Sequence, residues 1–180
     1  MLKITVPSVE MFDDRTAEFI VEPEVQLELE HSLVSLSKWE EKFEKPFLEN
    51  KDPTTEETVY YVQCMILNPE IAQEVILRLT SEHYKEINEY MNRKMTASWI
   101  TETEPKTRNH EIITAELIYY WMTVFNMPLE CEQWHLNKLF TFIQIANVKQ
   151  SKPKKMSRSE IAQRNRQLNE QRKAQYGTNG

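Results

Sequence analysis

The stretch HEIITAELIYYWMTVF, residues 110–125, is apolar on nearly every side of a helix and is followed closely by Pro128. A helix with this pattern is buried on most of its surface. A second helical pattern runs from Cys131 to Val148. Burying one large aliphatic or aromatic side chain contributes about 1.5–3 kcal/mol. We therefore expect these two helices to form a hairpin that anchors the fold.

Shorter helical segments precede this hairpin and are marked by capping residues and prolines. Thr54 and Glu57 have the spacing of a capping box, in which the two residues satisfy each other's backbone N–H groups. Pro46 ends the first helix because proline cannot donate a helical hydrogen bond. The expected helices begin at Ser32, Thr54, Pro69 and Thr80 or Ser81, and they end before Pro46 and at about Ile66, Leu79 and Asn92.

The first thirty residues alternate between apolar and polar side chains, as strands with one buried face do. Glu18 to Val21 is a third, shorter strand candidate that ends before Pro23. The two clearer strands have Leu2, Ile4 and Val6 in one and Val25, Leu27 and Leu29 in the other. A small antiparallel sheet or hairpin is therefore expected.

These patterns predict a mainly α (α+β) fold in three parts. A small N-terminal antiparallel β-sheet occupies residues 1–30, a helical core domain occupies 31–148, and a basic C-terminal helical arm occupies 149–180. Only two glycines occur, Gly177 and Gly180. Phosphate-binding loops, dinucleotide fingerprints and nucleophile elbows all require glycine. We therefore expect no enzyme of these classes, no catalytic residues and no cofactor.

The two cysteines, Cys64 and Cys131, indicate a reduced setting, because no leader segment suggests export. A Cys64–Cys131 disulfide is the less favoured alternative. The longest apolar run, Leu117 to Met122, is much shorter than the ~20 residues that span a bilayer. We expect a cytoplasmic protein without a membrane partner.

The charge of the chain is divided between an acidic body and a basic arm. Residues 149–180 carry nine basic and two acidic side chains, a net of +7, while residues 1–148 carry 13 basic and 26 acidic side chains, a net of −13. Ser157 and Glu160 have the spacing of a second capping box, and Ile161 and Leu168 share one helix face. The predicted partner-binding residues of the arm are Lys152, Lys154, Lys155, Arg158, Ile161, Arg164, Arg166, Leu168, Arg172 and Lys173.

Other chemistry-bearing residues are better explained as structural. Cys131 and His135 lie four apart and so share a helix face, but a zinc site needs three or four ligands and no further ligand motif completes one. Cys64 with His110 or His135 allows a thiol–imidazole pair without any specific signal for it. We therefore predict no metal site and no nucleophile.

Two further clusters also have a functional and a structural interpretation. Tyr119, Tyr120 and Trp121 offer rings on which a base can stack, but their place in an apolar helix favours core packing. Paired carboxylates can perform acid–base chemistry, but a set that alternates with Val and Leu is typical of a solvated strand face. That acidic set comprises Glu22, Glu24, Glu28 and Glu30.

Four blocks of residues after position 30 carry a family resemblance. They are HSLVSLSKWE with KPFL (31–40, 45–48), TEE with YVQCM (55–57, 61–65), ELIYYWM with Pro128 and CEQWHLNKL (116–122, 131–139), and PKKMS with RN and LN (153–157, 164–165, 168–169). Together they resemble the tail assembly chaperones of long-tailed bacteriophages. The resemblance implies a chaperone in the host cytoplasm that binds the tape measure protein, the tail tube protein or both, without catalysis.

The residues themselves leave other functions open. The same predicted fold is also compatible with a virion component, such as a head–tail connector or a minor tail protein. A nucleic-acid-binding regulator depends on the arm alone, and nucleic acid ranks last among the partners because the acidic body repels a duplex. Attraction between the arm and the acidic body of another copy predicts self-association through the arm.

Overall fold

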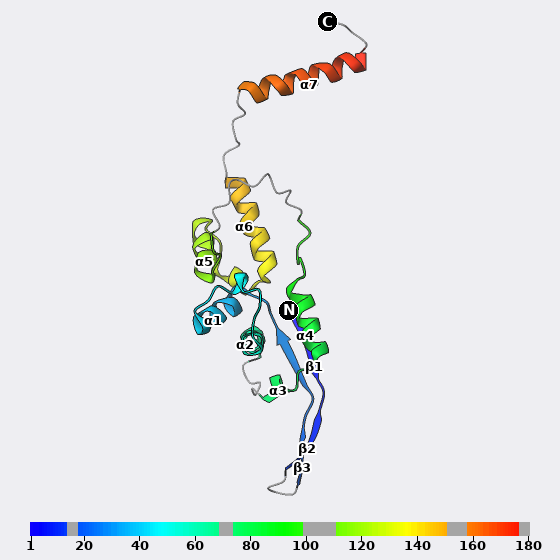
Figure 1. Ribbon diagram of the computed structural model, residues 1–180, viewed down its shortest axis with the longest axis vertical. Coiled ribbons are helices and arrows are strands. Elements are labelled where there is room, and N and C mark those ends of the chain that lie inside the picture. The colour runs from blue at the N-terminus through cyan, green and yellow to red at the C-terminus, as the bar shows by residue number, and fades with distance from the viewer. Residues whose placement is uncertain (14–17, 69–73, 99–110, 151–157, 177–180) are drawn as a thin grey trace. The chain divides into compact units, whose positions relative to one another are not determined.

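A computed structural model describes residues 1–13, 18–68, 74–98, 111–150 and 158–176 (Figure 1). The fold is mainly helical and of mixed α+β class, with antiparallel strands at the N-terminus, as the sequence predicts. Residues Met1–Asn147 form one compact unit and Val148–Gly180 form a second.

The elements follow one another in the order strands, then helices. The strands are β1 (Leu2–Val6), β2 (Val9–Asp13), β3 (Glu18–Glu22) and β4 (Val25–Leu29). The α-helices are α1 (Leu33–Phe43), α2 (Thr55–Met65), α3 (Glu74–Leu77), α4 (Ser81–Met91), α5 (Ala115–Val124), α6 (Leu136–Gln150) and α7 (Arg158–Tyr176). Two 3₁₀ helices, η1 (Phe47–Glu49) and η2 (Leu129–Gln133), lie between them.

The four strands form two antiparallel ladders in one continuous register. β1 pairs with β4, ending at Val6 opposite Val25, and β2 pairs with β3, beginning three residues further at Val9 opposite Glu22. The chain therefore builds a single two-stranded ribbon with a short interruption. The predicted alternation of β1 and β4 is confirmed, because their apolar residues are buried or half-buried. The strand predicted at Glu18 to Val21 is also present.

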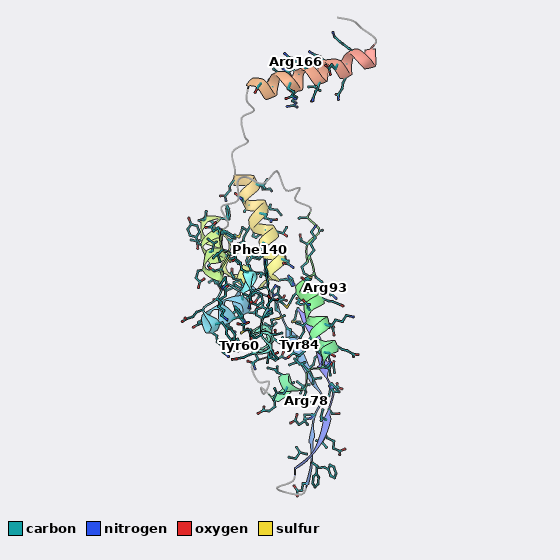
Figure 2. All side chains as sticks on the ribbon, viewed as in Figure 1. Tyr60, Arg78, Tyr84, Arg93, Phe140 and Arg166 are labelled. Carbon is teal, nitrogen blue, oxygen red and sulfur yellow. The ribbon has the colours of Figure 1, made fainter. Side chains whose placement is uncertain are left out.

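Arg78 binds the ribbon at its interruption, where a proline lies on each strand. Its guanidinium donates to the carbonyl oxygen of Pro7 and, at 3.1 Å, to that of Pro23. It also forms an ion pair of 3.0 Å with Glu22. Figure 2 labels Arg78 beside the ribbon. Because proline cannot donate to a ladder, this one side chain replaces the missing cross-strand links.

A first core cluster packs helices against the β1–β4 end of the ribbon. Leu27 and Leu29 of β4 are fully buried with Trp39 of α1, Tyr61 of α2 and Tyr90 of α4. The indole N–H of Trp39 donates to the carbonyl of Glu57 at 2.9 Å, which satisfies its polar atom inside the core. The β1–β4 end of the ribbon therefore belongs to the same compact unit as α1, α2 and α4.

Three helices begin with capping boxes. Thr54 and Glu57 form the predicted box at α2, and Ser32 caps α1 as expected. The cap of α4 is Thr80 rather than Ser81, the other residue that the sequence left open. Of the short helix predicted from Pro69 to Leu79, the structure shows α3 at Glu74–Leu77, and the predicted start at Pro69 lies outside the described residues.

A second core cluster joins α5 and α6, the two expected anchor helices, with Leu33 and Leu36 of α1. The prediction for α5 is wrong in two respects. The helix begins at Ala115 rather than His110, because Thr114 caps it and Ile112 precedes it as an exposed residue. It is also buried on one face alone: Tyr120 is 62% and Val124 47% exposed.

The helix predicted from Cys131 to Val148 is also interrupted. Leu129–Gln133 forms the 3₁₀ helix η2, and α6 begins at Leu136. His135 is held in an isolated antiparallel bridge with Ser32, and the N–H of Leu136 donates to the carbonyl of His31 at 2.7 Å. This pairing requires extended backbone at His135, so the α-helix begins after it.

Glu40 of α1 connects two distant elements through its carboxylate. One oxygen accepts from the N–H of Phe47 at 2.8 Å and the other from that of Ala115 at 2.7 Å. Burial raises the pKa of this carboxyl, while the two backbone N–H groups oppose the rise. The contact with Ala115 places a negative charge at the N-terminus of α5, where the helix dipole favours it.

We expect Glu40→Ala to lower the free energy of unfolding by about 2–5 kcal/mol, because two backbone donors lose their acceptor at ~1–3 kcal/mol each. Urea denaturation followed by circular dichroism measures this change. Glu41→Ala, a neighbouring exposed carboxylate, is the matched control and should change stability by less than about 0.5 kcal/mol. Equal effects of the two substitutions would contradict the role given to Glu40.

Candidate protein-binding surfaces

Helix α7 contains the part of the predicted arm that the structure describes. Ile161 is 45% and Leu168 38% exposed, so their apolar surface is available for contact. Four predicted basic residues, Arg164, Arg166, Arg172 and Lys173, are also exposed; Figure 2 labels Arg166. Lys152, Lys154, Lys155 and Ser157 lie outside the described residues, and Arg158 is placed by its backbone alone.

The exposed residues of α7 are arranged in stripes. Residues four and seven apart share a helix face, so Ile161, Leu168 and Arg172 lie along one side. Arg166 and Lys173, also seven apart, form a second stripe. A helix of this kind lacks the apolar surface that stabilises helices in water. It is therefore a suitable element to pack against another surface.

Helix α5 presents a second apolar surface, on the side that faces away from the core. Leu117, Tyr120 and Val124 follow one another at helical spacing, and each is exposed or half-exposed. Trp121 lies at the edge of this surface and packs in part against the second core. Tyr119, on the buried side, donates its hydroxyl to Glu132 at 2.9 Å. The expectation that all three aromatic residues lie in the core is therefore wrong for Tyr120.

The β2–β3 ladder presents a third apolar surface, which sequence reasoning missed. Phe12 is 52%, Phe19 69% and Val21 61% exposed. The two phenylalanines are cross-strand partners whose ring centroids lie 5.1 Å apart. In Figure 1 this end of the ribbon extends past the helices. We call the face formed by Phe12, Phe19 and Val21 the ribbon-tip face.

Acidic residues of the ribbon form ion pairs and hydrogen bonds within the fold. Glu22 pairs with Arg78, and Glu28 pairs with Lys3 at 2.6 Å. Glu30 lies 2.6 Å from the N-terminal ammonium group and accepts from the hydroxyl of Tyr90 at 2.7 Å. Glu24 alone among the four predicted acidic residues is exposed. Glu28 pairs with Lys3 at the solvent-exposed surface, so the prediction of a solvated acidic face is wrong for Glu22 and Glu30 only.

A buried polar cluster lies where the two cores meet. The Nδ1 atom of His31 and the hydroxyl of Tyr61 are 2.5 Å apart, and the rings of His31 and His135 are 5.2 Å apart. His135 donates through Nε2 to the carbonyl of Tyr90, while its Nδ1 accepts from the N–H of Asn137. These contacts fix His135 as the neutral Nε2–H tautomer.

Burial keeps this histidine pair neutral. Desolvation and the neighbouring His135 lower the pKa of His31 to about 3. Desolvation also lowers the pKa of His135. Sequence reasoning named His135 with Cys131 as a metal alternative, but among the residues that the structure describes no group of three or more His, Cys, Asp or Glu side chains is placed to hold a metal ion.

The two cysteines are free thiols that pack in different cores. Cys64 lies against the first core and Cys131 within the second, so the alternative of a disulfide between them is wrong. Burial raises the pKa of both thiols, which disfavours the reactive thiolate. His110, the other imidazole considered for Cys64, lies outside the described residues.

A cavity of about 320 Å³ lies between η1, α4 and α6. Asn137 lines it, and the side-chain amide of this residue donates to the carbonyls of Met91 and Arg93 at the end of α4. Asn92, also at the wall, donates to Asn88. These amides have structural partners, so the exposed apolar surfaces are the stronger candidates for function.

Comparisons of the chain with protein-family models, with curated proteins and with solved structures find no match. Within the described part of the chain, no helix has both the length and the apolar character needed to cross a membrane.

We expect the free energy of unfolding to fall as the pH is lowered below about 6.5, by ~1.4 kcal/mol per pH unit for His31. The sign follows from the lowered pKa: between pH 6.5 and about 3, the unfolded chain binds a proton at His31 that the folded chain excludes. Urea denaturation at a series of pH values measures the slope.

His31→Gln should make this slope shallower. His83→Gln is the matched control, because Gln at this position preserves the capping box of α4 and removes only a histidine without a buried pair. If the two variants change the pH dependence of the unfolding free energy equally, the assignment of this dependence to His31 is contradicted.

Proposed function

We propose that the protein is a tail assembly chaperone of a long-tailed bacteriophage, binding the tape measure protein in the host cytoplasm while tail tube subunits polymerise. The observation that carries this proposal is helix α7. It is a 19-residue helix that exposes two apolar residues, Ile161 and Leu168, and four basic residues, Arg164, Arg166, Arg172 and Lys173. Such a helix favours a macromolecular partner with acidic and apolar surface.

The outward face of α5 supports the same function. Its adjacent apolar residues are the half-buried Leu117 and the exposed Tyr120 and Val124. A grouped apolar face of this kind is typical of a protein–protein contact. Apolar faces on partner helices commonly bind each other at i, i+3, i+4 and i+7 positions. We assign this face to the client, and the resemblance of the sequence to tail assembly chaperones supports the tape measure protein as that client.

Co-expression with the tape measure protein of the same genome tests the function. We expect the tape measure protein to become soluble and to co-purify with this chain. Mass spectrometry of finished particles separates the chaperone from the alternative virion component. A chaperone is absent from the particles, whereas a connector or minor tail protein is present in fixed copy number. An insoluble tape measure protein with no complex would contradict the chaperone function.

Replacing both Tyr120 and Val124 with Ser should weaken the complex with the tape measure protein about tenfold or more, because truncation of buried anchors costs ~1–2 kcal/mol each. Pull-down from co-expressing cells, followed by titration of the purified proteins, measures the loss. Leu77→Ser, which changes an exposed apolar residue of α3, is the control. A full-affinity complex from the double variant would refute α5 as the client surface.

Removing residues 150–180 should reduce self-association of the chain. The deleted segment carries eight of the nine basic residues of the arm, and the remaining body is strongly acidic. Raising the salt concentration to about 0.5 M should weaken association of the intact chain, because screening shortens with ionic strength. Sedimentation velocity measures both effects. DNA binding by the intact chain alone, at physiological salt, would instead support the regulator.

A further inference from the structure

The ribbon-tip face continues the face of the ribbon that is covered by helices. The register runs without a shift from the β1–β4 ladder into the β2–β3 ladder. Side chains alternate between faces, so Phe12, Phe19 and Val21 follow on the side of the buried Val6. Helices cover that side along β1 and β4, whereas the ribbon-tip face is exposed.

We propose that the ribbon-tip face binds helix α7 of a second copy of this chain. The inference rests on the proposed self-association through α7 and names the surface that receives it. At the other end of the ribbon, helices already cover the apolar face of β1 and β4. A helix over the ribbon-tip face would cover the β2–β3 end in the same way. It also covers the part of the two-stranded sheet that is least stable alone, since an isolated ladder of two strands is marginal in water.

Charge favours α7 as the occupant. Glu10, Glu18 and Glu24 are exposed on or beside the β2–β3 ladder. The exposed stripes of α7 carry Arg172 next to its apolar residues and Lys173 beside them. Glu10, the cross-strand partner of Val21, shares the ribbon-tip face, while Glu18 and Glu24 flank it near the two ends of β3. The acidic group on this apolar face is therefore complementary to the basic residues beside the apolar stripe of α7, and complementary charges set the orientation and the rate of association.

The dimensions of the two surfaces agree. Ile161 and Leu168 are seven residues apart, which is about 10 Å along a helix at ~1.5 Å per residue. The five-residue ladder of β2 and β3 is about 14 Å long at ~3.4 Å per step. Both apolar residues of α7 therefore fit over the ladder at the same time. The 19-residue helix extends beyond it on both sides.

A second ribbon is a poorer occupant than α7. Two ribbon-tip faces placed together bring Glu10 of both copies into the shared interface. Like charges placed opposite one another destabilise a pairing. Glu10 thus disfavours ribbon-to-ribbon stacking.

The test uses the full-length chain and charge reversal on each surface. Arg172→Glu with Lys173→Glu should weaken self-association about tenfold, and so should Glu10→Lys with Glu18→Lys. An equimolar mixture of the two double variants should associate nearly as well as the unmodified chain, because one arm and one ribbon again carry opposite charges. Sedimentation equilibrium measures all three. A mixture that stays as weakly associated as its components would overturn the proposal.

Truncation of the apolar face is an independent second measurement. Phe19→Ser should weaken self-association about tenfold, while the control Leu77→Ser leaves it unchanged. Circular dichroism and thermal unfolding establish that both variants are folded. Full association of folded Phe19→Ser would overturn the assignment of the ribbon-tip face, as would a full-length chain that remains monomeric at all concentrations.

The outcomes separate this inference from the proposed function. If removal of residues 150–180 abolishes association and the ribbon variants do not, α7 binds another surface and only the present inference fails. If the tape measure protein does not bind the unmodified chain, the chaperone function fails whatever the ribbon variants do.

Discussion

The backbone from Glu28 to Ser32 is the constraint on which the rest of the larger unit depends. Glu28 accepts from the N–H of Leu67, and Glu30 donates to the carbonyl of Met65 at 2.9 Å, so the strand end is tied to the end of α2. His31 then accepts from Leu136 at the start of α6. One extended segment thus pairs in turn with β1, with the exit of α2 and with the entry to α6. Both hydrophobic cores are positioned by it.

The elements that sequence analysis predicted are those determined by local chemistry. Alternation along β1 and β4 and the capping residues Ser32, Thr54 and Thr80 all depend on neighbours within a few positions. The errors at α5 and α6 have the opposite origin. The start of α6 is determined by pairing with Ser32, more than one hundred residues away, and Ala115 is bound by Glu40 at a separation of 75. Apolar periodicity contains no information about such partners.

One candidate surface, the arm, was predicted from the sequence, whereas another, the ribbon-tip face, was not. The arm was found because charge imbalance and the spacing of Ile161 and Leu168 are visible in the sequence, and α7 presents both residues to solvent. The ribbon-tip face was missed although a signal existed. Extending the register of Leu2–Val6 with Val25–Leu29 by three residues would have paired Val9 with Glu22 and Phe12 with Phe19. The buried pair of His31 and Tyr61 had no comparable signal, because only the folded core brings these residues together.

The surfaces assigned to binding share a thermodynamic property that suits transient assembly. Exposed ion pairs contribute ~0–1 kcal/mol each, and the ribbon tip and α7 are each marginal elements when isolated. Part of the binding free energy is therefore spent on ordering the two elements themselves, which limits the affinity of each contact. In the proposed assembly, strength comes from repetition, because a copy with both an arm and a ribbon tip has two different surfaces and can bind a neighbour at each. Head-to-tail contacts of this type extend into chains or rings, and an array of weak contacts along the proposed client would dissociate readily once other subunits compete for the same length.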